Sequence, residues 1–118
     1  MQLNEVLFDD ATPIDGYGPG FFRIGGALRH GPILVLPDSV RDWGGYDDLE
    51  TALAARDRLD VLFVGTGPEI THVPPGFRRP LEEAGLGVET MSSPQACRTF
   101  NVLLGEGRRV GAALLPVP

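Results

Sequence analysis

The sequence predicts an α/β fold of three layers: a central, mainly parallel sheet flanked by helices, and an additional N-terminal antiparallel sheet or hairpin layer. Apolar runs alternate with helical patterns from residue 33 to residue 115, as expected for parallel strands joined by crossover helices. Before residue 31 the chain consists of short extended segments that glycines interrupt. We expect residues 1–118 to form a single domain, because this length is typical of one.

The N-terminal third contains two candidate strands, at residues 6–8 and 21–24. Between them, the sequence Gly-Tyr-Gly-Pro-Gly at residues 16–20 predicts a tight loop, because glycine adopts backbone conformations that other residues avoid. Gly25 and Gly26 predict a bulge or turn before the next segment. These short pieces would form the antiparallel layer.

Four apolar runs after Gly31 predict buried strands, at residues 33–36, 59–64, 87–91 and 110–115. Pro37 ends the first of them, and the sequence Gly65-Thr66-Gly67 ends the second. Continuous apolar runs of this length are typical of strands that are buried on both faces.

Three helical patterns lie among these strands. The first starts after Asp47, a candidate N-cap with Glu50 three residues later. The second ends at Gly85, and we expect it to begin near Arg79, because Pro80 inside a helix removes a hydrogen-bond donor. The third is the clearest: Ser92 or Ser93 caps it, Pro94 suits its first turn, and its buried stripe consists of Ala96, Phe100, Leu103 and Leu104.

The composition excludes several function classes. All ten basic residues are arginines, so chemistry that requires a lysine amine, such as a Schiff base or a Walker-type phosphate site, is excluded. A net charge of −6 argues against nucleic acid as the main partner. The chain has no apolar stretch long enough to span a membrane, and residues 1–5 do not resemble a signal peptide. We therefore expect a soluble cytoplasmic protein without direct membrane insertion.

One candidate ligand pocket combines Gly65, Thr66 and Gly67 with Arg98 and Asn101. The three-residue segment follows a buried strand, where α/β folds tend to bind ligands, and its amides could hold an anion. An arginine nearby could hold a carboxylate or phosphate. The alternatives are that the glycines serve a tight turn alone, and that Arg98 and Asn101 fasten the last helix to the sheet. Arg98 would then bind loop carbonyls or Glu89.

No group of residues predicts catalysis. Cys97, the single cysteine, lies beside an apolar stripe, and is either a thiol activated by the helix and Arg98 or a buried core residue. His30 and His72 are 42 residues apart, without the spacing of metal ligands, and we expect both in exposed loops. We therefore predict no catalytic residues, no metal and no cofactor, and leave an enzymatic activity open but disfavoured.

Aromatic residues near glycines and turns are candidates for an interaction surface, namely Tyr17, Phe21 and Trp43. Large aromatic side chains often anchor protein interfaces. The alternative for the pair Phe21 and Phe22 is that one of them fills the core, because they alternate along a strand. The sequence leaves the position of Trp43 open.

The order of several blocks resembles the MTH-938-like domain over residues 3–117. The blocks are residues 16–20, 22–26, 31–37, 64–67, 88–91 and 96–104, the last reading Ala-Cys-Arg-Thr-Phe-Asn-Val-Leu-Leu. The resemblance implies a three-layer fold, no established enzyme activity and no known cofactor. Its eukaryotic members point to assembly of mitochondrial respiratory complex I. The favoured hypothesis is thus a non-catalytic interaction or assembly module with a protein partner, self-association being left open; the alternative is a small-anion or metabolite-binding protein.

Overall fold

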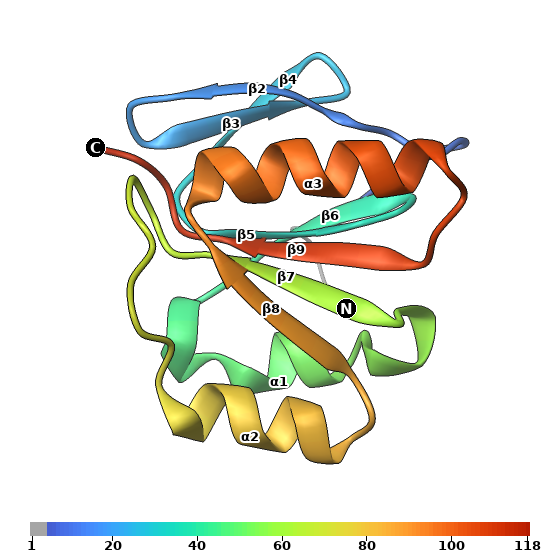
Figure 1. Ribbon diagram of the computed structural model, residues 1–118. Coiled ribbons are helices and arrows are strands. Elements are labelled where there is room, and N and C mark those ends of the chain that lie inside the picture. The colour runs from blue at the N-terminus through green and yellow to red at the C-terminus, as the bar shows by residue number, and fades with distance from the viewer. Residues whose placement is uncertain (1–4) are drawn as a thin grey trace.

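The computed structural model describes residues 5–118 of the chain, so most of the N-terminal stretch examined for a signal peptide lies outside the described residues. Six strands form a central sheet in the order β1-β6-β5-β9-β7-β8, and three form a second sheet in the order β2-β3-β4 (Figure 1). In chain order the strands are β1 Val6–Leu7, β2 Ile14–Gly18, β3 Phe21–Ile24, β4 Ala27–His30, β5 Ile33–Leu36, β6 Ser39–Asp42, β7 Val61–Gly65, β8 Gly87–Met91 and β9 Val110–Leu114.

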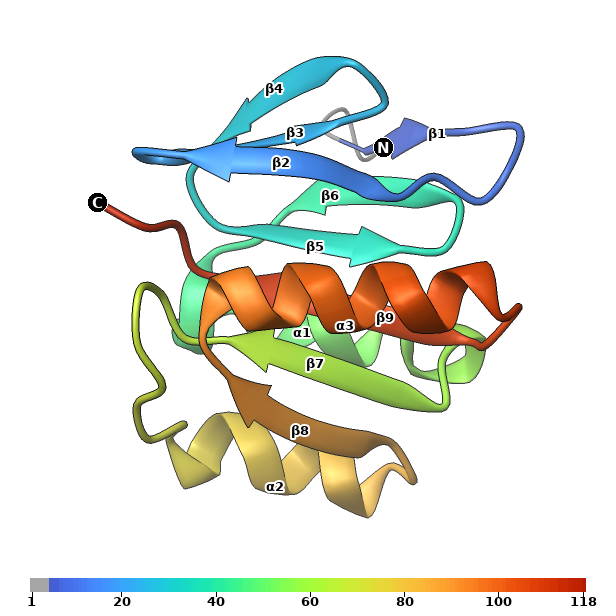
Figure 2. The ribbon, with the colours of Figure 1, turned by 45° about the horizontal axis from the view of Figure 1, so that its top comes forward.

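The helices cover both faces of the central sheet. They are α1 Leu49–Leu53, between the short 3-10 helices Gly45–Asp47 and Arg56–Arg58, then α2 Pro75–Glu83 and α3 Ser93–Gly105. Helices α1 and α2 lie on one face, while α3 and the three-stranded sheet lie side by side on the other (Figures 1 and 2). The predicted α/β architecture of three layers, with an antiparallel N-terminal sheet, is confirmed.

The central sheet is mixed rather than mainly parallel. β7 pairs in parallel with β8 and β9, but the β5–β9, β5–β6 and β1–β6 pairs are antiparallel. An apolar run such as Ile33–Leu36 shows that a strand is buried, not which way it runs. A parallel neighbour requires a crossover connection, whereas β5 leaves directly through a two-residue turn into β6, so no helix fixes its direction.

In the first half of the chain one prediction was wrong, and one strand was not predicted. Residues 16–18 belong to β2, and the turn comprises Pro19 and Gly20 alone. Gly18 lies under the ring of Phe21, and a Cβ there would come within 2.4 Å of that ring, so this glycine allows close cross-strand packing. Strand β6 was missed, because in Ser39–Asp42 only Val40 is apolar.

The starts of two helices also differ from expectation. Asp48, not Asp47, caps α1, and its carboxylate accepts from the amide of Thr51 at 3.2 Å. Helix α2 begins at Pro75 and contains Pro80. The carbonyl that Pro80 leaves without a donor belongs to Gly76, an exposed residue of the first turn, where water can replace the lost hydrogen bond.

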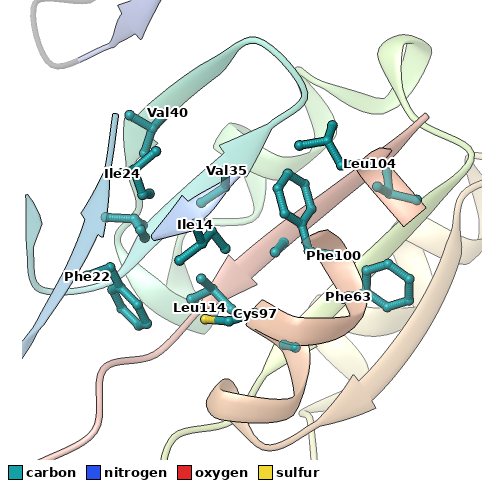
Figure 3. Packing of buried hydrophobic residues seen from close by; sticks show 14 residues of the cluster. Ile14, Phe22, Ile24, Val35, Val40, Phe63, Cys97, Phe100, Leu104 and Leu114 are labelled. Atoms are coloured by element: carbon teal, nitrogen blue, oxygen red, sulfur yellow. The ribbon is translucent and has the colours of Figure 1, made fainter. Parts of the chain in front are cut away.

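Two apolar cores form, one on each face of the central sheet. Alternate residues of each strand point to opposite faces: Val35 joins the core under α3, and Leu34 the core under α1 and α2. The core under α3 also receives the inner face of the three-stranded sheet (Figure 3). Its labelled members are Ile14, Phe22, Ile24, Val35, Val40, Phe63, Cys97, Phe100, Leu104 and Leu114. Helix α3 thus packs on the central sheet and against β2, the edge strand of the small sheet, with its remaining side outward.

Candidate functional site

The end of β7 forms a junction with the first residue of α3. The amide of Gly67 donates to Ser93 Oγ at 2.9 Å, the amide of Ser93 donates to the carbonyl of Gly67 at 2.7 Å, and Ser93 Oγ donates to the carbonyl of Leu115. A Cβ on Gly65 would lie 2.9 Å from the Cα of Ser93, closer than real contacts allow. Gly65 therefore permits the close approach that builds this junction.

Thr66 organises the loop that follows. Its amide donates to the carbonyl of Met91 at 2.9 Å. Its hydroxyl donates to the carbonyl of Glu69 at 2.7 Å and accepts from the amide of Thr71 at 3.0 Å. The amides of both Thr66 and Gly67 thus have partners within the protein, so neither is free to bind an anion. Between the two anchored residues lies Ile70, which is 66% exposed.

Asn101 joins α3 to the three-stranded sheet. Its Nδ2 donates to the carbonyl of Ile14, and its Oδ1 accepts from the amide of Ile14, both at 2.8 Å. The side-chain amide thus pairs with a strand residue as a neighbouring peptide would. Asn101 therefore fastens α3 to this sheet, which is the alternative to ligand binding that the sequence had left open for Arg98 and Asn101.

Arg98 lies on the outer face of α3 and lines a hollow of about 350 Å³ with Gln95, Thr99, Val102 and Leu103. Its Nη2 donates to Gln95 Oε1 at 2.8 Å. Gly65, Thr66, Gly67 and Asn101 are not among the residues that line this hollow. The junction contacts Ser93, and five residues along an α-helix correspond to a rotation of about 140°, so Arg98 faces elsewhere. The structure does not bring the five candidate pocket residues to one hollow.

The outer face of α3 has an unusual character for a solvent-exposed surface. Arg98 is the single charged residue of the thirteen in this helix. Within residues 5–118, no carboxylate lies at ion-pairing distance from it. Val102, one turn later, is 61% exposed. Val102 was not among the predicted site residues, although a helical projection places it about 160° from the buried Phe100, where a polar residue is expected.

The thiol of Cys97 points into the core beneath α3 (Figure 3). Burial raises its pKa from 9.0 to about 12, although the positive charge of Arg98 acts in the opposite direction. At neutral pH the thiol is protonated and enclosed by apolar side chains, which is the opposite of an activated nucleophile. The buried interpretation of Cys97 agrees with this geometry.

The three aromatic candidates for an interaction surface have different environments. Tyr17 is 44% exposed, and Phe21 is partly buried over β2. Trp43 is 3% exposed, which corrects its assignment to an interaction surface. Its ring packs against Tyr46 and Phe77, with centroids 5.9 and 5.4 Å away, and its Nε1 donates to the carbonyl of Asp48. A bulky ring beside glycines can close a core as readily as it can anchor a partner. Of the pair Phe21 and Phe22, it is Phe22 that fills the core.

His30 and His72 are both exposed, His30 at the end of β4 and His72 in the loop before α2. No group of three or more His, Cys, Asp or Glu side chains suited to hold a metal ion occurs among residues 5–118. None of the helices in this part of the chain is both long enough and apolar enough to cross a bilayer.

This fold places the chain in a known class of α/β proteins. A family model described as "Protein of unknown function (DUF498/DUF598)" matches residues 14–115. The chain belongs to this family. A solution structure from Bordetella pertussis, described as a Mth938-like domain, is similar with a TM-score of 0.74 and 27% identity over 98% of this chain and 92% of that one. The resemblance found in the sequence is thereby confirmed.

Relatives extend across bacteria and animals. An uncharacterised protein of Rhodobacter capsulatus is 50% identical over 100% of this chain and 95% of its own length. The NADH dehydrogenase [ubiquinone] 1 alpha subcomplex assembly factor 3 of Bos taurus is 38% identical over 92% of this chain, and the match spans 62% of the bovine protein. A crystal structure from Bartonella henselae, described as an outer membrane protein, has a TM-score of 0.84 and 36% identity over 94% of this chain and 99% of that chain.

Proposed function

We propose that this protein is a non-catalytic interaction module that helps to assemble a larger protein complex of the respiratory chain. The observation that carries the proposal is the 38% identity to the bovine assembly factor over 92% of this chain. The two cores, the Ser93 junction and α3 all lie within the matched family region. The buried, protonated Cys97 and the internally bonded amides of Thr66 and Gly67 support a scaffold rather than a reaction centre.

The surface best suited to contact a partner is the outer face of α3, defined by Gln95, Arg98, Thr99, Val102 and Leu103. Tyr17 and Ile70 are two further exposed large side chains. We place the protein in the cytoplasm, as one domain, with a protein rather than a nucleic acid as partner. Interface hot spots are enriched in arginine, and α3 presents one beside the exposed apolar side chain of Val102.

Deletion of the gene in the source organism tests the proposal. We expect less fully assembled NADH dehydrogenase on native gels, with other respiratory complexes unchanged, and recovery when the wild-type protein is supplied again. A respiratory complex assembled in normal amount and at normal rate in the deletion strain would contradict the proposed function.

The small-anion alternative retains Arg98 but loses the backbone donors on which it depended. A thermal-shift screen of phosphates, carboxylates and nucleotides against the wild type and Arg98→Ala tests it. Binding of such a ligand raises the melting temperature of the wild type by mass action and leaves that of the variant unchanged. A screen without any such difference would exclude those ligands at Arg98.

A further inference from the structure

We propose that the outer face of α3 docks an acidic segment of a partner protein, with a carboxylate on Arg98 and an apolar side chain beside Val102. The inference rests on the proposed function in so far as that function requires a partner. It adds the chemistry by which the partner is recognised.

The charge of Arg98 favours a partner segment that carries a carboxylate. The chain carries a net charge of −6, yet α3 contains no acidic residue between Ser93 and Gly105. The polar partner of Arg98 within the helix is the neutral amide of Gln95, and no carboxylate among residues 5–118 forms an ion pair with its guanidinium. A planar guanidinium is suited to bind a carboxylate through two parallel hydrogen bonds.

The net charge does not prevent such a complex. Exposed charges that are farther apart than about 8 Å are largely screened at physiological ionic strength. The contact between Arg98 and a carboxylate of the partner is shorter than this distance, so the local pair decides the electrostatic energy. Raising the salt concentration should therefore weaken binding.

The apolar part of the surface favours a partner segment that also carries an apolar side chain. Val102 is 61% exposed, and Leu103 beside it is partly buried against the core, so an apolar strip runs along the hollow. Covering this strip removes apolar surface from water, which favours binding. Arg98 and Val102 are one helical turn apart, roughly 6 Å along the axis. A segment with an acidic and an apolar side chain at a matching spacing would contact both.

The shape of the hollow favours a protein segment over a free metabolite. All five residues that line it belong to α3, so it is a depression on one helix and has no opposing wall. Small-molecule sites enclose most of the ligand surface, which one helix does not do. An extended or helical segment of a partner can instead lie along the helix and cover the depression from outside.

A titration followed by amide NMR shifts tests the inference with the intact protein. The probe is a short synthetic peptide, blocked at both ends, in which Leu and Glu recur one helical turn apart. Matched peptides carry Lys in place of Glu or Ser in place of Leu, and octanoate serves as a free carboxylate. We expect the Leu–Glu peptide to shift the amides from Gln95 to Leu103 and to bind most tightly of the four.

Three variants make the test specific. Arg98→Ala and Val102→Ser should each weaken binding of the Leu–Glu peptide about tenfold, as expected for one charge-assisted hydrogen bond or one apolar contact. Arg79→Ala, which removes an exposed arginine of α2, is the control and should bind like the wild type. Equal binding of the Lys peptide, equal binding by Arg98→Ala, or shifts spread over α2 would overturn the inference. If octanoate binds as tightly at the same residues, the site takes a small carboxylate rather than a partner segment. That result would also overturn the inference.

The deletion strain separates this inference from the proposed function. Supplying a variant with both Arg98→Glu and Val102→Asp should fail to restore the respiratory complex. Full restoration by this variant would overturn the docking surface and leave the assembly function intact. A deletion without any assembly defect would overturn the assembly function. The titration would then decide whether α3 binds an acidic segment.

Discussion

Helices α2 and α3 cover opposite faces of the same sheet but present different chemistry to solvent. On α2, Arg78 pairs with Glu82 at 3.2 Å. It also donates to the hydroxyl of Thr90 and to the carbonyl of Val88, both at 3.0 Å. On α3, the corresponding outward arginine, Arg98, contacts the amide of Gln95. Arg78 of α2 is thus paired within the protein, whereas Arg98 of α3 has no carboxylate partner among residues 5–118.

The two helices differ in how their outward side chains contact the sheet beside them. Strand β8 lies at one edge of the central sheet, and an unprotected edge strand can pair with other chains. Arg78 occupies part of that edge, so α2 closes its side of the molecule. On the other side, α3 is fixed mainly by its inner residues, and of its outer face only Leu103 packs against the core. Residues on this outer face can therefore change with little loss of stability, which leaves the face available for binding.

The largest effect is expected on the inner side of α3. Asn101→Ala removes both hydrogen bonds to Ile14 and leaves a buried amide and carbonyl without partners. Each such group costs about 1–3 kcal/mol, so we expect the free energy of unfolding to fall by about 2–4 kcal/mol in urea denaturation. Val102→Ala, the neighbouring outward residue, is the control. Equal losses in the two variants would remove the distinction between the inner and outer sides of α3.

Cys97 gives the inner side of α3 a pH dependence. The pKa of the Cys97 thiol is about 12 in the folded protein, whereas in the unfolded chain it is near 9. The unfolded state therefore gains stability as the pH rises above 9, and the stability of the fold decreases. Relative to Cys97→Ala, we expect the wild type to lose about 1.4 kcal/mol per pH unit between roughly pH 9 and 12. Denaturation curves of the two proteins at several pH values measure this, and parallel pH dependences would contradict it.

Features set by local burial were predictable from the sequence. Strands β5 and β8 and helix α3 appear within a residue or two of their expected bounds, because burial imposes its period directly on the sequence. The direction of β5 and the existence of β6 were not predictable, because both depend on pairing between strands. Trp43 was ambiguous for a similar reason: Phe77, one of the rings that bury it, lies 34 residues away in the chain.

The candidate site was predictable in its members but not in its geometry. Asn101 and Arg98 were both identified, yet the partner of Asn101 is Ile14, 87 residues away in the chain. The expected proximity of Arg98 to Gly65 failed because the glycine approaches Ser93, on another side of the helix. Sequence spacing fixes which residues share a helix face, but the tertiary fold decides what that face meets.

On α2, removing the arginine should have a moderate effect. Arg78→Ala deletes a half-exposed ion pair and two hydrogen bonds to β8, so we expect a loss of about 1 kcal/mol in the free energy of unfolding. The exposed edge of β8 should also raise self-association, measured as a higher weight-average mass in concentrated samples by sedimentation. The neighbouring Arg79→Ala should change neither quantity. A variant Arg78→Ala that remains as monodisperse as the wild type would show that the edge needs no such protection.

The smallest effect on stability is expected on the outer face of α3. Arg98→Ala removes an exposed hydrogen bond to Gln95, and Val102→Ser replaces an exposed apolar side chain, so each should change the free energy of unfolding by less than about 0.5 kcal/mol. Urea denaturation of both variants beside Arg78→Ala gives the comparison directly. A loss above 1 kcal/mol in Arg98→Ala would mean that this arginine fastens the helix after all, and the contrast with α2 would disappear. A negligible loss of stability together with a tenfold loss of peptide affinity would instead separate binding from folding at a single residue.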